Sequence, residues 1–218
     1  MLNLLRLRLR QGYNPVERTF KWWKTMGVYI FTPEDLIRYG SARPEQLEFL
    51  REKLLERKDI LIVGSSRSGK TKLVEALIHY VPEDRKVAVI TAYGEFKPFK
   101  PHVVVIDTQF DGESLETRTR LVIEKIKAIN PDYVVIDTLH TVSVPKILKT
   151  LMNDYAFIVT SLALTDDIKG EVMHWLRIDE ETFNMFDVVV ELKRDLRTGL
   201  RVINRIYEVR NGELIQVL

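Results

Sequence analysis

The run of eight residues GSSRSGKT, at positions 64–71, limits the possible folds of this chain more than any other feature of its sequence. It matches the pattern G-x-x-x-x-G-K-[ST] at every fixed position. In proteins this pattern joins a buried strand to a helix, and its main-chain N–H groups turn inward to surround phosphate groups. Here an apolar stretch, residues 60–63, precedes the run, and a helical pattern from about 69 to 80 follows it. The sequence therefore predicts a phosphate-binding loop, which we call the glycine loop.

Each position of the glycine loop is expected to contribute to nucleotide binding. Small residues let the main chain approach the phosphates, and the following helix directs its partial positive charge at the same point. Lys70 is expected to reach the β- and γ-phosphates and to serve catalysis, and the hydroxyl of Thr71 is expected to ligate Mg²⁺. The expected cofactors are ATP and Mg²⁺, and the alternative is a glycine turn that holds no ligand. The predicted phosphate-binding residues are Gly64, Ser65, Ser66, Arg67, Ser68, Gly69, Lys70 and Thr71.

Continuous apolar strands alternate with helical patterns through most of the chain. Such strands are typical of a parallel sheet that helices cover on both faces. Toward the end, turn dipeptides at 198–199 and 211–212 separate strand patterns, as in an antiparallel meander. We therefore expect an α/β fold of the P-loop NTPase class, with a three-layer αβα core, a mostly parallel sheet and a C-terminal antiparallel meander. The expected strands are residues 60–63, 87–90, 103–106, 133–136, 156–160, 188–192, 200–209 and 213–217, and the expected helices begin near 33 and 44 and cover 69–80, 113–129, 144–152 and 166–176.

The first thirty residues are markedly basic. They contain six Lys or Arg and one Glu, which gives +5, whereas the whole chain carries +2, so the remainder sums to −3. Leu and Arg alternate over residues 5–10, which predicts a half-buried strand with a solvated face. Because aromatic residues follow these arginines, contact with nucleic acid or with an anionic membrane surface is the alternative.

The composition excludes several classes of site. The chain has no cysteine, which excludes disulfides and thiolate metal sites, and its four histidines lack metal-ligand spacing. No apolar run approaches the roughly 18 residues that span a bilayer, and the amino terminus lacks the apolar stretch of a signal peptide. We therefore expect a cytoplasmic protein without a transmembrane segment, with peripheral attachment to a membrane as the alternative.

A P-loop enzyme also needs a carboxylate at the end of a neighbouring strand, to hold the metal and its water shell. Asp107 and Asp137 both follow apolar strand patterns. We favour Asp137 as the metal-side acid, because the long helix before it suggests a crossover that would place its strand beside the strand of the glycine loop. Thr160, at the end of the next strand, could contact the γ-phosphate or could only cap a turn.

With these landmarks in place, the chain resembles the motor ATPases of secretion systems, pili and the archaellum, including type II and type IV secretion ATPases. The resemblance lies in the order of the segments FTPEDLIRYG (31–40), ILIVGSSRSGKT (60–71), NPDYVVI (130–136) and FDVVVEL (186–192). It implies a RecA-like ATPase core that works as a homohexameric ring, with nucleotide between subunits, and a protein partner in a secretion- or pilus-like assembly. It also implies that residues 1–31 are a short β remnant of an N-terminal domain and that residues 32–218 form the ATPase domain.

Three positions depart from the pattern of that family. The family's general-base glutamate corresponds to Thr91, the Gly-Glu that ends its Walker B segment corresponds to Asp137-Thr138, and its histidine corresponds to Leu162. Orienting the attacking water is part of the catalysis, so these changes predict slow hydrolysis. Glu95 is the candidate replacement for the catalytic base, and a solvated or structural glutamate is the alternative.

The resulting hypothesis is a ring-forming motor that binds and hydrolyses ATP to drive assembly or transport of a macromolecular complex. The substitutions suggest a first alternative, a hydrolysis-deficient nucleotide-binding ring component or regulator. The basic first thirty residues suggest a second, a DNA-translocating or packaging ATPase of a mobile element. Arg118 and Arg120 could act as arginine fingers toward a neighbouring subunit, or could lie at a solvated helix end.

Overall fold

The computed structural model describes residues 29–92, 94, 96–109, 112–138 and 140–218. Residues 29–32 lead into the first described helix without forming a helix or strand themselves. The strands expected in the first thirty residues fall almost wholly in residues 1–28, which lie outside the described part of the chain. The division into a segment 1–31 and a domain 32–218 therefore stays a prediction.

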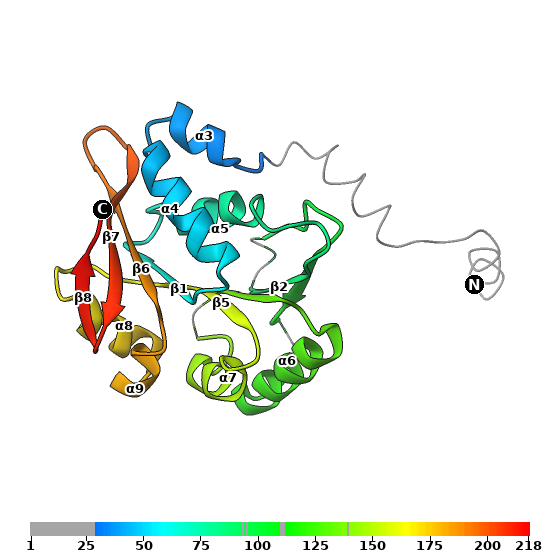
Figure 1. Cartoon of the computed structure of the whole chain (residues 1–218). Helices are drawn as coiled ribbons and strands as arrows, with labels where there is room; N and C mark the ends of the chain where they lie inside the picture. The colour runs from blue at the N-terminus through cyan, green and yellow to red at the C-terminus, as the bar shows by residue number, and fades with distance from the viewer. Residues whose placement is uncertain (1–28, 93, 95, 110–111, 139) are drawn as a thin grey trace, which may run out of the picture.

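Within the described residues, eight strands form one mixed sheet in the order β3-β2-β4-β5-β1-β6-β7-β8 (Figure 1). The strands from β3 to β6 in this order are parallel to their neighbours, and β7 and β8 add an antiparallel edge. This arrangement confirms the expected α/β fold with a mostly parallel sheet and an antiparallel C-terminal part. The strands are β1 (Ile60–Gly64), β2 (Val87–Thr91), β3 (Val103–Asp107), β4 (Tyr133–Asp137), β5 (Ala156–Ser161), β6 (Val188–Arg194), β7 (Arg201–Arg210) and β8 (Glu213–Gln216).

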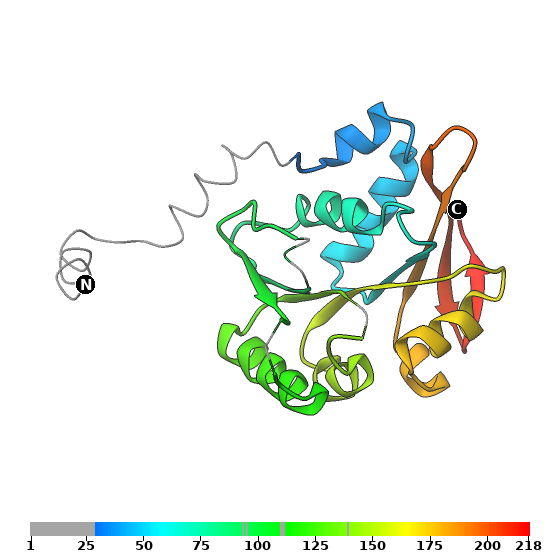
Figure 2. The same cartoon turned by 180° about the vertical axis from the view of Figure 1, so that it is seen from behind.

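Helices cover both faces of the sheet (Figures 1 and 2). On one face, α3, α4 and α5 pack their apolar side chains against alternate strand residues such as Ile62. On the other face, α6 to α9 pack against the intervening residues, such as Leu61 and Val63. This alternation follows from the strand geometry, because successive side chains point to opposite faces. The helices are α3 (Pro33–Arg38), α4 (Pro44–Leu55), α5 (Lys70–Ile78), α6 (Leu115–Ile129), α7 (Val144–Leu151), α8 (Ile168–Leu176) and α9 (Glu180–Phe183).

The start of α3 is fixed by its own sequence. The Thr32 hydroxyl accepts a hydrogen bond from the main-chain N–H of Asp35, and the Asp35 carboxylate accepts one from the N–H of Thr32. Pro33 occupies the first helical position, where a missing N–H costs nothing. This capped turn holds the adjoining residues Phe31 and Tyr39 in place beside α5, as described below.

One predicted neighbour in the sheet is wrong. We expected the strand that ends at Asp137 to lie beside β1, but β4 pairs with β2 and β5, and β5 lies between β4 and β1. The crossover from β1 through α5 to β2 skips two strand positions, which β4 and β5 fill later. Crossover length indicates a parallel connection, but it does not indicate how many positions the connection skips.

The helix α9 has no counterpart among the expected elements. It is a single turn that Asp179 caps through a hydrogen bond from the N–H of Thr182. One turn is too short to show helical periodicity in a sequence. Its Phe183 is fully buried and joins the apolar cluster on the α6 to α9 face of the sheet.

Candidate nucleotide-binding site

The glycine loop connects the carboxyl end of β1 to α5, and two of its glycines occupy positions where a side chain would be strained. Gly64 has a φ of 154°, and a Cβ there would lie 2.5 Å from the carbonyl oxygen of Leu192 in β6. Gly69 has a φ of 104° and caps the amino end of α5. The main chain can therefore pass close to β6 and enter α5 at its amino end, where the partial positive charge of the helix lies.

Lys70 lies over the glycine loop. Its Nζ donates hydrogen bonds to the carbonyl oxygens of Gly64 at 2.9 Å and Ser65 at 2.8 Å. Burial lowers the pKa of Lys70, and the negative charge of Asp137 offsets part of that effect. The ammonium group is thus held at the mouth of the loop by two neutral acceptors, which a charged ligand can replace.

Asp137, the last residue of β4, connects the glycine loop to the sheet through side-chain hydrogen bonds. The Thr71 hydroxyl donates to Asp137 Oδ2 at 2.7 Å, and the Thr160 hydroxyl donates to Asp137 Oδ1 at 2.9 Å. Asp137 is buried, with 7% of its surface exposed. Residues from α5, β4 and β5 therefore lie together at the carboxyl ends of the parallel strands, as expected for parallel strands that end together.

The donor set at this point fits Mg²⁺. The Thr71 hydroxyl and the Asp137 carboxylate are hard oxygen ligands, and both oxygens of Asp137 now face hydroxyl donors that a metal or its water shell could displace. In the described residues there is no group of three or more His, Cys, Asp or Glu side chains that could hold a metal ion. One carboxylate agrees with Mg²⁺ chemistry, because this ion is usually held by one or two carboxylates together with substrate phosphates.

Asp107, the second sequence candidate, does not join this cluster. It is exposed at the end of β3, and β2 separates β3 from β4. Its carboxylate accepts hydrogen bonds from the N–H groups of Gly94 at 3.2 Å and Gln109 at 2.9 Å. Asp107 therefore holds together the turns that follow β2 and β3.

Neutral hydroxyl groups surround the Asp137 side of the site. Thr91 ends β2 in register with Asp137, and its buried Oγ1 has no hydrogen-bond partner among the described residues. The hydroxyls of Thr138 and Thr108 each lie 2.8 Å from that of Thr141. Of the two threonines that were compared with family glutamates, Thr138 bonds to Thr141, whereas the Thr91 hydroxyl has no partner among the described residues.

The remaining sequence candidates do not meet at Asp137 in the described structure. Glu95, the candidate base, lies outside the described residues. Arg120 lies on α6, on the sheet face opposite α5, and pairs with Glu124 at 2.8 Å. Arg118 also lies on α6, and its buried Nε has no hydrogen-bond partner in the described part of the chain. Leu162 is half-buried just after β5.

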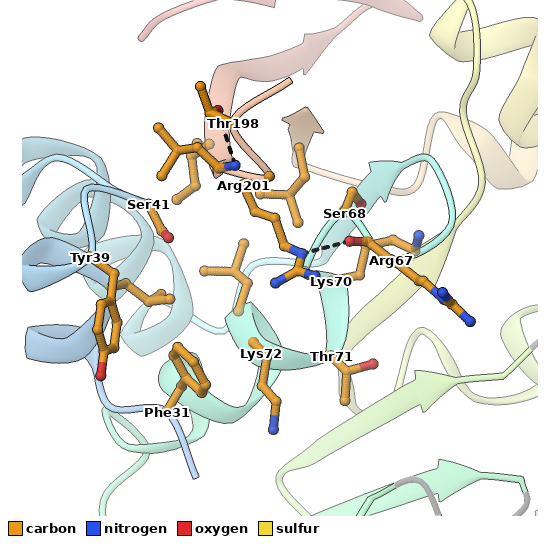
Figure 3. A pocket seen from close by; sticks show the side chains of 17 residues that line it. Phe31, Tyr39, Ser41, Arg67, Ser68, Lys70, Thr71, Lys72, Thr198 and Arg201 are labelled. Carbon is orange, nitrogen blue, oxygen red and sulfur yellow. Dashed lines mark hydrogen bonds between the residues drawn. The ribbon is translucent and has the colours of Figure 1, made fainter. Parts of the chain in front are cut away.

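A pocket of about 830 Å³ opens beside the glycine loop (Figure 3). Its lining includes apolar side chains, among them those of Phe31, Leu36 and Leu200. The lining also includes basic side chains, and none of the described residues that line the pocket is acidic. Such a combination suits a ligand with an apolar ring and a polyanionic tail. The basic residues that line it are Arg67, Lys70, Lys72 and Arg201.

Phe31 is anchored to the helix that follows the glycine loop. Its main-chain N–H donates to Glu75 Oε2 at 3.2 Å, and the Nζ of Lys72 lies 5.4 Å from the centre of its ring. Lys72 also pairs with Glu75 at 2.9 Å. Burial raises the pKa of the Glu75 carboxyl, and the bond from Lys72 counteracts this rise.

The residues that line this pocket outside the glycine loop were not predicted as site residues from the sequence. Phe31 and Tyr39 belong to a segment whose sequence predicted a helix start and a family resemblance, but no contact with the ligand. Arg201 comes shortly after the turn dipeptide at 198–199, and its sequence position predicted only that it lies in a strand. Neither motif nor periodicity reveals that chain segments so far apart meet, since the contact depends on how β6 and β7 return to the glycine loop.

The sequence from residue 26 to residue 218 matches the model of the family described as "Uncharacterised conserved protein UCP018868". The chain belongs to this family. The UCP018868 match includes the glycine loop, Asp137 and the pocket, so the whole candidate site lies within the family region.

Two curated relatives match this UCP018868 chain over 106 residues, which is 48% of its length. The uncharacterized protein MJ1287 of Methanocaldococcus jannaschii is 29% identical, and the match covers 39% of that protein. The type IV secretion system protein VirB11 of Bartonella henselae is 30% identical, and the match covers 30% of it. The chain therefore spans less than half the length of either relative.

A solved structure shares the fold. The VirB11 ATPase of the Brucella suis type IV secretion system, in complex with sulphate, is similar with a TM-score of 0.61 and 17% identity. The similarity covers 92% of this UCP018868 chain and 60% of the VirB11 chain. Together with the sequence match to VirB11, this fold supports a secretion ATPase-like superfamily relationship.

Proposed function

We propose that this chain binds Mg·ATP beside the glycine loop and hydrolyses it, as a RecA-like, ring-forming motor ATPase of the secretion, pilus and archaellum type. One observation carries the proposal. Thr71, which follows Lys70 at the start of α5, is joined to Asp137 at 2.7 Å. A loop that encloses a polyphosphate and a strand-end carboxylate on the metal side are two of the parts that P-loop hydrolysis requires.

Nucleotide binding would exchange partners at Lys70 and Thr71. The Lys70 ammonium would leave the carbonyl oxygens of Gly64 and Ser65 for charged phosphate oxygens, which accept stronger hydrogen bonds. The Thr71 hydroxyl would turn from Asp137 toward the metal, and Asp137 would hold the water ligands of the metal. Bound there, Mg²⁺ would offset the negative charge of the β- and γ-phosphates.

The apolar side chains of the pocket lining would give the nucleobase of ATP a place to bind. Its volume, about 830 Å³, falls within the range of roughly 300–1,000 Å³ that is typical of small-molecule sites. Aromatic groups such as Phe31 and Tyr39 would pack against a planar base, while the basic side chains of the lining would bind the phosphates.

Phosphate release from Mg·ATP by the full chain tests the proposal. The Lys70→Ala substitution is expected to lower kcat by about two orders of magnitude or more, because it removes a charged donor from the transferring phosphoryl group. Lys127→Ala is the matched control, since Lys127 is an exposed lysine near the end of α6. If wild type and Lys70→Ala release phosphate at the same rate, hydrolysis at this site is contradicted.

A second candidate function is nucleotide binding without turnover, in a ring component or regulator. The observation that favours it is the set of neutral threonines around Asp137, above all Thr91, whose hydroxyl is buried and unpaired within the described residues. A neutral threonine hydroxyl lacks the carboxylate that would act as a base and orient the attacking water. Tight Mg·ATP binding by the wild type, together with turnover no faster than that of Lys70→Ala, would favour this candidate.

The ring and the protein partner are proposed from the relationship to secretion ATPases. The structure of the described residues contains no helix that is long and apolar enough to cross a membrane. A motor of this kind would act on a partner assembly, at or near a membrane surface. Measurement of particle mass with and without Mg·ATP tests the ring, and a monomer in both conditions contradicts it.

A further inference from the structure

Arg201 brings the antiparallel part of the sheet into the candidate site (Figure 3). It begins β7, yet its Nε donates a hydrogen bond of 2.8 Å to the main-chain oxygen of Arg67 in the glycine loop. Its aliphatic stem lies against Gly69, where an added Cβ would be 3.5 Å from the Cδ of Arg201. The side chain therefore rests at the amino end of α5, the end that the loop turns toward phosphates.

The guanidinium of Arg201 has donors left for a ligand. An arginine carries five N–H donors in a planar fork, and the bond to Arg67 uses only the one on Nε. Within the described residues Arg201 forms no ion pair, whereas Lys72, another cation of the pocket, pairs with Glu75 at 2.9 Å. Figure 3 shows the side chain of Arg67 directed away from Arg201. Lys70 and Arg201 are thus the pocket cations best placed to meet an anion.

The bond to Arg67 also fixes where the guanidinium can reach. Arg67 has a φ of 59°, a left-handed conformation that costs energy in a residue other than glycine. A hydrogen bond to its carbonyl oxygen helps to hold this conformation. With Nε held there, the two terminal nitrogens of Arg201 remain available to a ligand in the pocket, beside the amino end of α5 (Figure 3).

We propose that Arg201 is a phosphate ligand in this site, and that it donates from its terminal nitrogens to the α- or β-phosphate of a nucleoside di- or triphosphate. This inference rests on the proposed nucleotide-binding function and extends it to the antiparallel strands. Arg201 would hold the glycine loop and the ligand together, so that nucleotide affinity depends on the packing of β7 against the loop.

Calorimetric titration of the full chain with Mg·ADP, and with inorganic tripolyphosphate, tests this role. Arg201→Gln is expected to weaken both ligands by tenfold or more, the order of a lost charged hydrogen bond. Arg201→Lys keeps the charge and is expected to lose less affinity than Arg201→Gln. Arg210→Gln is the matched control, because Arg210 ends the same strand, is exposed, and lies outside the pocket lining.

The salt dependence separates a phosphate ligand from a residue that only supports the loop. A direct ionic contact makes Mg·ADP affinity fall more steeply with KCl in the wild type than in Arg201→Gln. If Arg201→Gln binds Mg·ADP as tightly as the wild type, or if Arg201→Lys is as weak as Arg201→Gln with an unchanged salt slope, the proposed role is overturned. If the wild type binds neither ligand, the nucleotide-binding proposal itself fails. Wild-type binding that Lys70→Ala abolishes and Arg201→Gln leaves intact overturns the Arg201 role alone.

Discussion

The hydroxyl of Thr71 is the link through which a metal ion would connect the glycine loop to the sheet. It donates to Asp137 Oδ2 at 2.7 Å, and Thr160 supplies the other hydroxyl on that carboxylate. Valine has nearly the same shape as threonine but no hydroxyl. A change of Thr71 therefore probes the metal ligand without emptying the space that the side chain fills.

Mg²⁺ is expected to raise the ATP affinity of the wild type, and we expect Thr71→Val to make this increase roughly tenfold smaller. Losses of this size follow the removal of groups that hold a metal or orient its ligands. Affinity measured in EDTA should change little, because the main-chain groups that hold the phosphates remain. Calorimetric titration with ATP, in Mg²⁺ and in EDTA, gives both values.

Thr150→Val serves as the control for Thr71→Val, since the Thr150 hydroxyl is exposed and bonds only to the Lys146 carbonyl oxygen of its own helix, α7. An equal Mg²⁺ dependence in the wild type and Thr71→Val would remove Thr71 from the metal site.

At the scale of the element, the junction of β1 and α5 depends on close contact with β6. A Cβ at Gly64 would lie 2.5 Å from the Leu192 carbonyl oxygen and 2.7 Å from the Ser68 hydroxyl oxygen. Main-chain atoms of a paired strand cannot move aside at low cost. The glycine at this position thus serves packing as well as main-chain conformation.

Gly64→Ala is expected to lower the free energy of unfolding clearly more than Gly112→Ala, and to weaken nucleotide binding. Gly112 has a φ of 76° with nothing within 4 Å of an added Cβ among the described residues, so its substitution measures conformational strain alone, about 1 kcal/mol. Urea denaturation of both variants supplies the comparison, and equal losses would show that contact with β6 is unimportant.

The elements themselves follow closely from local sequence signals. Continuous apolar runs predicted β1, β2, β4 and β5, and the Thr32-Pro33 pair predicted the start of α3, because these signals act over neighbouring residues. The position of β4 did not follow, because strand order depends on which later strands fill the gap beside β1. The pocket did not follow either, because Phe31 and Arg201 come from distant segments that only tertiary packing brings together.

At the scale of the whole molecule, a half-buried acid, Asp59, lies at the end of the sheet opposite the glycine loop. Asp59 precedes β1 and accepts a hydrogen bond of 2.7 Å from the N–H of Phe157 in β5. Its own N–H donates to Asp187, which precedes β6, at 2.9 Å. Burial raises the pKa of Asp59 to about 7, and the negative charge of Asp187 adds to the rise.

This raised pKa makes global stability depend on pH. The unfolded chain releases the Asp59 proton near pH 4, whereas the folded chain keeps it until about pH 7. In that window the folded state binds more protons, so the Asp59 contribution to the free energy of unfolding falls as pH rises. Above about pH 7 the half-buried Asp59 carboxylate is charged in both states, and the full cost of its charge in the folded state remains.

Asp59→Asn keeps the acceptor for the Phe157 N–H and removes the ionisation. Its Tm relative to the wild type is therefore expected to increase between about pH 4 and pH 7 and to stay constant above that, with a gain of several degrees. Thermal melts of the two proteins across this range measure the difference, which isolates Asp59 from other titrating groups. A difference that does not change with pH would contradict the raised pKa.

The bond from Arg201 to the glycine loop joins residues 134 positions apart in the chain. Contacts over such distances form late, because the intervening chain must be ordered before they can be made. In the described structure β1 also pairs with strands that come much later in the chain, β5 and β6, so the glycine loop gains its final surroundings only when these strands are in place. Ligand affinity is thus acquired at the end of folding, and a bound nucleotide would in turn favour the completely folded chain over partly folded ones.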